Sequence, residues 1–296
     1  MAPCEQSERS RKLRQWQADA LLLGVALIWG STFVLVRQTV LHFPVYAFLS
    51  LRFALAAVML FVLFGQRVRT LHPRMFGAGM AIGLFLFGGY AFQTVGLQYT
   101  SASKAGFITG LSVVIVPCLS GLLIKRIPER QALLGVTLAT VGMALLTLER
   151  DLSPSRGDLI VLGCAFCFAL HIMAVSLFAP RTDALALTFV QITVVAVLSG
   201  LVTLATTGWR WPVPSEVFYA AVFTGVLATG LAFAIQNNVQ KWTSATHTAL
   251  IFATEPVFAA LFGYFLAGEH LTKAGIIGCG LILLGMIVAE LQPART

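Results

Sequence analysis

The sequence predicts an all-α membrane protein with ten transmembrane helices, arranged as two inverted five-helix repeats. Of its 296 residues, 58% are hydrophobic and 11% are charged, and the mean hydropathy is +0.86. Soluble globular domains contain roughly 45–50% apolar and about 25% charged residues. Apolar segments of roughly 20 residues recur along the chain, which is the helical span of a bilayer core, whereas a membrane β-barrel would show shorter alternating strands. The chain is therefore predicted to be a multi-pass helical protein.

The two halves of the chain resemble each other. A shift of 143 positions superposes these pairs: Ser101 on Ser244, Gln93 on Gln236, Gly135 on Gly278, and Gly142 on Gly285. In the earlier helices, a shift of 139 places Arg52 on Gln191. The chain is therefore predicted to contain an internal duplication.

Proline, serine and basic residues separate the apolar segments. The five helices expected in the first half are Asp19–Arg37, Pro44–Phe64, Met75–Leu97, Ser101–Ile124 and Gln131–Leu148. Their breaks fall at His42-Phe43-Pro44, in the basic run Arg67–Arg74 and at Arg126-Ile127-Pro128. The five expected in the second half are Asp158–Phe178, Asp183–Thr206, Glu216–Val239, Ser244–Leu266 and Thr272–Leu291. Their breaks include Ser153-Pro154-Ser155, Ala179-Pro180-Arg181 and Trp211-Pro212-Val213-Pro214.

The basic residues predict the orientation of the chain. With the N-terminus inside, about twice as many lysines and arginines fall on inner as on outer segments, so both termini are expected in the cytoplasm. Five helices per repeat, an odd number, make the second copy enter the membrane inverted. The predicted parts are an N-terminal tail 1–17, a first repeat 18–149, a linker 150–156, a second repeat 157–291 and a C-terminal tail 292–296.

The charge, the cysteines and the motifs of the sequence disfavour several classes of function. The net charge of +8 fits cytoplasmic loops and anionic lipid better than nucleic acid in a chain this apolar. Cys164 and Cys167 form a CxxC without a second ligand pair, so we expect no metal, no disulfide and no cofactor. No GxxxxGK[ST] loop is present, which disfavours ATP-driven transport. Inverted repeats are a common construction of secondary transporters, whose site lies near the membrane midplane between the repeats.

Glu255 is predicted near the middle of its helix, directly before Pro256. A carboxylate at that depth is protonated, paired or in contact with water. It could accept a proton or bind a substrate ammonium group. Alternatively, a protonated Glu255 could bond the backbone carbonyls that Pro256 leaves without partners. The first copy has Ser112-Val113 at the equivalent positions, so this feature belongs to the second repeat alone.

Other polar residues at membrane depth are candidates for substrate contact. Gln93 and Gln236 match across the repeats, as do Lys104 and His247, which could hold a substrate carboxylate or gate the two mouths. Side-chain amides also join membrane helices, and a lysine near a helix end can reach the interface. Arg52 is interpreted as a packing residue, and His171, outside these sets, as a hydrogen-bonded core histidine.

Aromatic residues complete the candidate substrate site. They are Trp29, Tyr90, Tyr99 and Trp242, of which Tyr99 and Trp242 are equivalent under the repeat. They could stack on planar or apolar groups in a cavity, or form the interfacial aromatic belt.

Four short motifs in order, together with the paired repeats, carry a family resemblance. The motifs are Leu27-Ile28-Trp29-Gly30-Ser31, Arg52, Thr254-Glu255-Pro256 and Gly268-Glu269. From about Ala18 to Leu291, the chain resembles the EamA-domain branch of the drug/metabolite transporter superfamily. The first copy departs from the pattern at Ser112-Val113 and at Arg126, which stands opposite Glu269.

The resemblance implies a bacterial inner-membrane exporter of small metabolites with a central cavity between the repeats. Family members of similar size and layout export amino acids, including aromatic ones. We therefore expect a monomeric secondary transporter in the lipid bilayer and not an enzyme. It would be proton-coupled or would work by facilitated diffusion. The alternatives are a broad-specificity efflux transporter, an intramembrane serine hydrolase built on Gly110-Leu111-Ser112, and a membrane assembly component.

Overall fold

The computed structural model describes residues 3–69, 72–100, 102–123, 129–147, 155–209, 211–267 and 272–290. Every element in these ranges is helical. In chain order the α-helices are α1 Pro3–Gly30, α2 Phe33–His42, α3 Val45–Arg69, α4 Pro73–Gly96, α5 Ala102–Gly110, α6 Ser112–Leu123, α7 Arg130–Thr147, α8 Arg156–Phe178, α9 Ala184–Thr206, α10 Ser215–Gly225, α11 Ala232–Val239, α12 Ala245–Phe252, α13 Glu255–Ala267 and α14 Lys273–Glu290. Short irregular turns of helix are η1 Ala179–Arg181, η2 Val226–Leu231 and η3 Gln240–Trp242.

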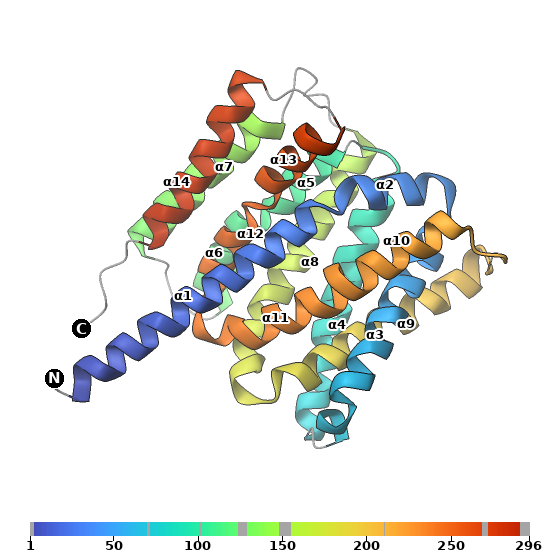
Figure 1. Ribbon diagram of the computed structural model, residues 1–296, viewed down its shortest axis with the longest axis horizontal. Helices are drawn as coiled ribbons and strands as arrows, with labels where there is room; N and C mark the ends of the chain where they lie inside the picture. Colours follow the sequence, from blue (N-terminus) through green and yellow to red (C-terminus); the bar gives the residue numbers. More distant parts are fainter. Residues whose placement is uncertain are drawn as a thin grey trace.

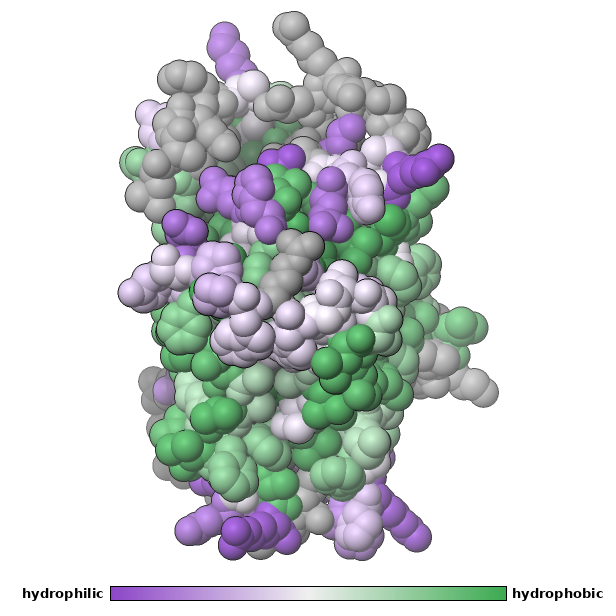
Figure 2. All heavy atoms as spheres, turned by 90° about the vertical axis from the view of Figure 1, so that its right-hand side faces the viewer, coloured by the Kyte–Doolittle hydropathy of each residue, from purple (hydrophilic) through white to green (hydrophobic). Residues whose placement is uncertain are grey.

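Eight segments of the described chain are helical, long enough and apolar enough to span a membrane, some of them made of two consecutive helices. Two shorter apolar helices, α7 and α14, accompany them. Figure 1 shows the helices packed in one bundle, with α7 and α14 side by side at one edge. On the face drawn in Figure 2, hydrophobic residues cover most of the surface between hydrophilic residues near both ends. The prediction of an all-helical membrane protein is confirmed.

Six of the ten predicted helices form as single helices close to their expected bounds, namely α3, α4, α7, α8, α9 and α14. Local sequence explains the starts of two of them. Ser155 and Asp158 form a reciprocal capping box at the start of α8, and Asp183 accepts two backbone N–H groups at the start of α9.

Four predicted helices are interrupted. The first divides at Ser31 and Thr32 into α1 and α2, and α1 extends back to Pro3 through most of the predicted N-terminal tail. The fourth divides at Leu111 into α5 and α6. The eighth contains the π-helical turn η2, and the ninth divides at Ala253 and Thr254 into α12 and α13. The prediction of one uninterrupted helix for each of these spans was wrong at these points.

Some predicted features lie outside the described residues. They are Arg126, residues 150–154 of the linker, Gly268-Glu269 and the tail 292–296.

Equivalent helices of the two halves pack against each other in antiparallel pairs. A side-chain carbon at Gly135 would meet the Gly285 carbonyl, and one at Gly142 would meet the Gly278 carbonyl, so α7 and α14 run in opposite directions. Because Gly135 is equivalent to Gly278 and Gly142 to Gly285, each glycine packs against the counterpart of the other. The predicted role of these four glycines in close helix contact is confirmed.

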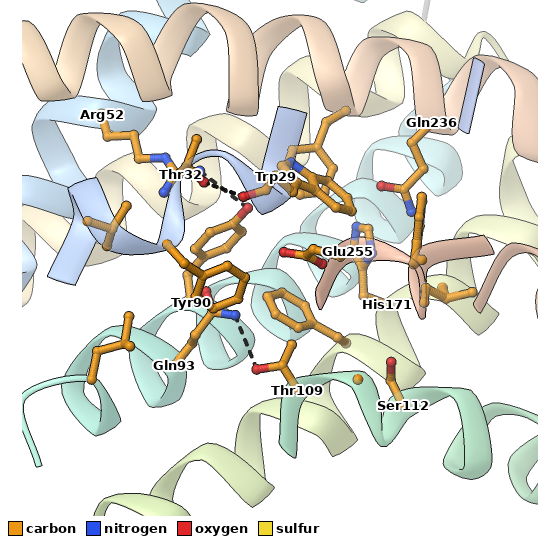
Figure 3. Close-up of a pocket in the computed structure, with 18 residues that line it drawn as sticks. Trp29, Thr32, Arg52, Tyr90, Gln93, Thr109, Ser112, His171, Gln236 and Glu255 are labelled. Atoms are coloured by element: carbon orange, nitrogen blue, oxygen red, sulfur yellow. Dashed lines mark hydrogen bonds between the residues drawn. The ribbon is translucent and has the colours of Figure 1, made fainter. Parts of the chain in front are cut away.

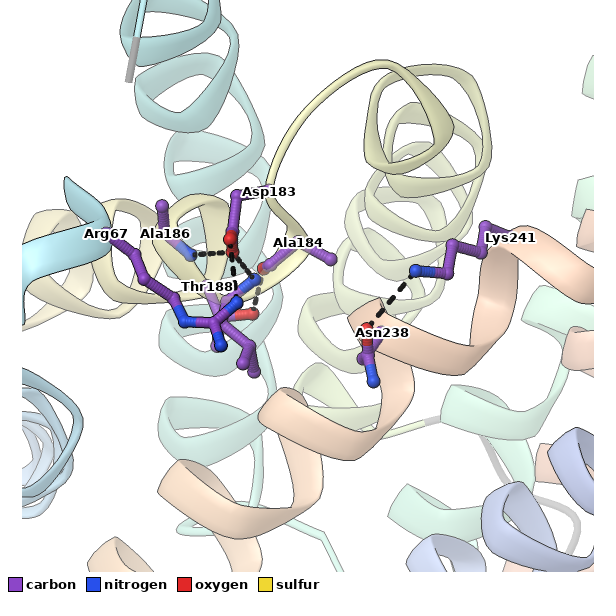
Figure 4. Close-up of polar contacts among 8 residues, drawn as sticks. Arg67, Asp183, Ala184, Ala186, Thr188, Asn238 and Lys241 are labelled. Atoms are coloured by element: carbon purple, nitrogen blue, oxygen red, sulfur yellow. Dashed lines mark hydrogen bonds and ion pairs between the residues drawn. The ribbon is translucent and has the colours of Figure 1, made fainter. Parts of the chain in front are cut away.

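The α3–α9 pair is antiparallel as well. Ser50 donates a hydrogen bond to the Ala196 carbonyl near one end, and Arg67 forms an ion pair of 2.9 Å with Asp183 at the other. Figure 4 shows this ion pair, with the nearby contact of Lys241 to the Asn238 side chain. The two halves are thus joined along α3–α9 and along α7–α14.

Candidate functional site

A cavity lies between the two halves of the chain. Space not filled by protein atoms amounts to about 730 Å³, including the part open to solvent. Its lining includes the polar side chains Thr32, Arg52, Tyr90, Gln93, Thr109, Ser112, His171, Gln236 and Glu255, drawn in Figure 3. The apolar part of the lining includes five aromatic residues, Trp29, Phe33, Phe168, Phe233 and Phe252.

Equivalent residues from the two repeats line the cavity together. The shift of 139 relates Trp29 to Phe168, Thr32 to His171 and Phe33 to Ile172, and the shift of 143 relates Tyr90 to Phe233, Gln93 to Gln236, Thr109 to Phe252 and Ser112 to Glu255. All of these residues line the cavity. The cavity therefore lies on the axis that relates the repeats.

Two broken helices deliver residues to the middle of this cavity. Ser112 is the first residue of α6 and Glu255 is the first residue of α13, and both follow a break at the same repeat position. Pro256 is tolerated because the first turn of a helix needs no intrahelical N–H donor there. A carboxylate at a helix N-terminus also interacts favourably with the helix dipole. The breaks therefore place both residues at the cavity, where Ser112 contributes a hydroxyl group and Glu255 a carboxyl group.

Glu255 is partly accessible from the cavity, and Figure 3 shows its carboxyl group between Trp29 and His171. Among the described residues, no hydrogen bond or ion pair engages this carboxyl group. The bond to backbone carbonyls considered from the sequence is therefore not observed in the described part of the chain. Glu255 is available to an occupant of the cavity.

Arg52 lines the cavity from α3, although only 3% of its surface is exposed. Its Nε donates to Thr229 Oγ1 at 2.7 Å, and its Nη2 donates to the Tyr90 hydroxyl at 3.5 Å. The guanidinium carbon also lies 4.9 Å from the centre of the Tyr90 ring. These contacts use only part of the five N–H groups of a guanidinium. Arg52 was interpreted as a packing residue, and its place in the cavity adds the capacity to bind an anion.

Aromatic rings form one wall of the cavity. The Trp29 ring lies 5.3 Å from the Phe233 ring and 4.9 Å from the Phe252 ring. The Trp29 Nε1 group donates to the Ala228 carbonyl at 2.7 Å, which ties the first half to the second. Tyr90 lies edge-on to both Phe168 and Phe233. These contacts hold the rings in place, which favours stacking against a planar or apolar group.

The remaining polar residues are oriented by neighbours. Gln93 donates to Thr109 Oγ1 at 3.2 Å, and Gln236 donates to Gln240 Oε1 at 3.1 Å. His171 and Gln191 share a hydrogen bond of 2.7 Å, which fits the predicted core histidine, although His171 also lines the cavity.

The structure brings five of the nine predicted site residues together in the cavity, namely Trp29, Tyr90, Gln93, Gln236 and Glu255. The other four lie elsewhere. Tyr99 is 61% exposed near the end of α4, and Trp242 is 40% exposed with the Lys241 ammonium 4.8 Å from its ring.

His247 is buried in α12, with its Nε2 3.3 Å from Asp19 Oδ1. Lys104, in α5, interacts electrostatically with Asp158. Neither lines the cavity.

Sequence reasoning did not select several lining residues, including Thr32, Phe33, Thr109, Phe168, Phe233 and Phe252. A usable signal was present, because the two repeat shifts relate Trp29 to Phe168, Tyr90 to Phe233 and Thr109 to Phe252. Systematic transfer of every candidate across the repeats would have found Phe168 and Phe233.

Comparison with known proteins places this architecture in a family. The sequence model of the EamA-like transporter family matches residues 16–148 and again residues 155–290. The chain belongs to the EamA-like transporter family. This family is part of the drug/metabolite transporter superfamily, so the resemblance found in the sequence is confirmed. The protein is a multi-pass membrane transporter with two EamA domains and not an enzyme.

Proteins of several prokaryotes match this chain along nearly their full length. An uncharacterized transporter of Archaeoglobus fulgidus is 34% identical over 280 residues, which are 95% of this chain and 88% of the relative. The uncharacterized transporter YyaM of Bacillus subtilis is 29% identical over 91% of this chain and 92% of its own length. A solved structure described as "Crystal structure of protein" superposes with a TM-score of 0.78 at 22% identity, covering 94% of this chain and 99% of the other, which supports the fold.

Proposed function

We propose that this EamA transporter exports a small zwitterionic metabolite, an amino acid with an apolar or aromatic side chain, through the central cavity. The observation that carries the proposal is the presence of Arg52 and the unpaired Glu255 in one cavity. Opposite charges held apart in an apolar site match the carboxylate and ammonium groups of one amino acid.

Arg52 would bind the substrate carboxylate. Thr229 and Tyr90 hold its guanidinium group in place, so less conformational freedom is lost when it binds. Glu255 would bind the substrate ammonium, and Gln93 and Gln236 would add hydrogen bonds from equivalent positions. The rings of Trp29, Phe233 and Phe252 would pack against the substrate side chain.

The antiparallel packing of equivalent helices supports transport by alternating access. Equivalent helices that run in opposite directions are the property of inverted repeats, which can exchange their conformations and so open the cavity to either side. Residues 18–149 and 157–291 would be the two exchanging units. The excess of basic residues on the inner segments supports cytoplasmic termini in a bacterial plasma membrane. We propose a monomer as the transporting unit.

Purified protein in proteoliposomes tests this proposal with three related compounds. L-phenylalanine carries both charges, 3-phenylpropionate lacks the ammonium group and phenethylamine lacks the carboxylate. We expect saturable flux of radiolabelled phenylalanine and competition by each analogue that is weaker by roughly tenfold or more, the value of one charge-assisted contact. Equal competition by all three compounds would contradict the zwitterion site and favour broad-specificity efflux. Absence of flux across a full amino-acid and metabolite panel would contradict the substrate class.

Glu255→Gln sharpens this test because it removes the charge with little change in shape. This variant should lose the preference for phenylalanine over 3-phenylpropionate and keep the preference over phenethylamine. Glu216→Gln, at an exposed glutamate at the start of α10, is the matched control and should behave like the parent.

An imposed pH gradient, applied to the parent and to Glu255→Gln, tests whether transport is coupled to protons through Glu255. If the gradient changes the flux of the parent but not that of the variant, Glu255 carries the proton coupling. An equal change in both proteins would exclude this role.

A further inference from the structure

The π-helical turn η2 contacts two residues of the cavity and is present in the second repeat alone. It interrupts the span Ser215–Trp242 between α10 and α11. The shift of 143 relates it to residues 83–88, which belong to the continuous α-helix α4. π-Helical turns are rare, and many of them lie at functional sites. A feature of one repeat only is not required by the duplicated fold, so it has a local reason.

The turn releases one backbone carbonyl, which pairs with Trp29. In an α-helix the Ala232 N–H would donate to the carbonyl four positions back, that of Ala228. In η2 it donates instead to the carbonyls of Leu227 and Thr229. The Ala228 carbonyl accepts a hydrogen bond from Trp29 Nε1 at 2.7 Å, across the interface of the two repeats. Ala228 is fully buried, so this bond satisfies an acceptor that would otherwise cost free energy.

The next residue of the same turn holds Arg52. Thr229 is fully buried, and its Oγ1 accepts from Arg52 Nε at 2.7 Å. Because Nε lies in the plane of the guanidinium group, this bond fixes the orientation of that plane. A side-chain carbon at Gly225 would lie 2.6 Å from the Arg52 carbonyl oxygen. One at Gly230 would meet the Met59 side chain, so two glycines allow α3 to pack closely against the turn.

The residues that make these bonds do not line the cavity themselves. Ala228 and Thr229 are absent from its lining, whereas Trp29 and Arg52 both belong to it. Ala228 and Thr229 therefore act on an occupant of the cavity only through the indole and the guanidinium group that they hold.

We propose that η2 is a positioning element of the substrate site, in which Thr229 orients Arg52 and the Ala228 carbonyl orients Trp29. Because the two bonds are made by neighbouring residues of one turn, a shift of the turn moves both groups. Recognition of the substrate carboxylate is thereby coupled to recognition of the substrate side chain. This inference rests on the proposed function, which assigns the carboxylate to Arg52 and the side chain to the aromatic wall.

Competition in proteoliposomes tests the role of Thr229. Thr229→Val removes the acceptor with little change in shape. We expect the inhibition constant of 3-phenylpropionate, which carries the carboxylate alone, to rise by roughly fivefold or more, and that of phenethylamine to stay at the parent value. Thr229→Ser keeps the hydroxyl group and should restore the parent value. An equal rise for both compounds, or no rise for either, would overturn the proposal.

Thr224→Val is the matched control for this variant. Thr224 is fully buried like Thr229, but its hydroxyl donates to the Ala220 carbonyl of its own helix, and it does not line the cavity. Both inhibition constants should therefore keep their parent values in Thr224→Val.

Trp29→Phe tests the coupling from the other side of the turn. It leaves the Ala228 carbonyl without its donor, so the Ala232 N–H can pair with it and η2 can become α-helical. Thr229 would then move away from Arg52. The variant should therefore weaken competition by 3-phenylpropionate more than competition by phenethylamine, and equal weakening would contradict the coupling. Trp29→Phe also covers the case in which Thr229→Val does not fold.

A spectroscopic measurement separates this inference from the proposed substrate. The indole ¹⁵N–¹H resonance of Trp29, assigned by its loss in Trp29→Phe, reports the bond to Ala228 without any substrate. It should shift in Thr229→Val and stay in place in Thr229→Ser and Thr224→Val. An unshifted resonance in Thr229→Val would overturn the coupling. A shifted resonance without flux of any amino acid would instead overturn the proposed substrate and leave the positioning role of η2 standing.

Discussion

The contact between α7 and α14 makes a quantitative prediction for Gly142→Ala. A side-chain carbon at Gly142 would lie 2.6 Å from the Gly278 carbonyl oxygen and 2.8 Å from the Ile282 nitrogen, whereas ordinary contact begins at 3.4 Å. The helices would therefore have to separate by the difference, 3.4 minus 2.6, or about 0.8 Å. Both obstructing atoms belong to backbone, so no side chain can rotate away.

The magnitude follows from two opposing effects. Overpacking of this kind costs about 1–3 kcal/mol, and the upper end applies because the clash is with backbone. Alanine gains about 1 kcal/mol over glycine in helix propensity. We therefore expect Gly142→Ala to lower the free energy of unfolding by about 2 kcal/mol, the difference between these effects.

Gly280→Ala is the matched control, since Gly280 lies on α14 with no atom within 4 Å of the added carbon. It should be neutral or stabilising. Thermal unfolding of the purified proteins in one detergent, followed by circular dichroism, measures both. A Gly142→Ala protein as stable as Gly280→Ala would refute the close α7–α14 contact and, with it, this evidence for antiparallel equivalent helices.

Two further perturbations test individual contacts. Trp29→Phe should lower stability by about 1–3 kcal/mol, because it removes the hydrogen bond to the buried Ala228 carbonyl and keeps most of the ring contact; Trp16→Phe, at an exposed tryptophan, should have no effect, and equal stabilities would contradict the bond. Burial of the Asp183 carboxylate opposes ionisation, but hydrogen bonds from the Ala186 N–H and from Arg67 outweigh it and hold the pKa below the usual 3.8. Because the folded pKa is the lower one, this stabilisation is present above pH 3.8 and is lost as the pH falls through the folded pKa. The temperature of thermal unfolding, measured as a function of pH, should therefore fall more steeply in acid for the parent than for Asp183→Asn. Parallel curves for the two proteins would exclude a contribution of the Asp183 carboxylate to stability.

The sequence predicts the approximate number and the order of the apolar helices well, because each must be long enough to cross the bilayer and the duplication repeats them. It predicts the breaks poorly. Pro256 signals an irregularity in the ninth span, yet the equivalent break at Leu111 lies in a stretch with no local proline, since Pro117 is within α6. That break is set by the packing of helices around the cavity, and the helix propensities of the local residues carry no information about that packing.

The sequence also did not predict which polar residues lie at the depth of the cavity. Lys104 and Thr109 lie on the same helix and both are polar, yet only Thr109 lines the cavity. Their separation of five positions corresponds to about 7.5 Å along the helix, enough to move a side chain from a binding site to its entrance. A sequence reports the helix face of a residue more reliably than its depth, which explains why Lys104 and His247 were predicted with the substrate-binding residues.

The two repeats line the cavity with equivalent positions but with different chemical groups, and this limits how a substrate can bind. The first repeat contributes the guanidinium group of Arg52 and the second the carboxyl group of Glu255, and their equivalents Gln191 and Ser112 carry neither group. A zwitterion held by both therefore has one orientation across the axis, with its carboxylate toward α3 and its ammonium toward α13. Under the alternating access proposed above, Arg52 and Glu255 are presented to the other side by helices of different sequence, so the two end states need not bind the substrate equally. Such a difference in affinity between the inward and outward states can be measured by binding from each side, and replacing Ser112 by glutamate should reduce it by making the two repeats more alike.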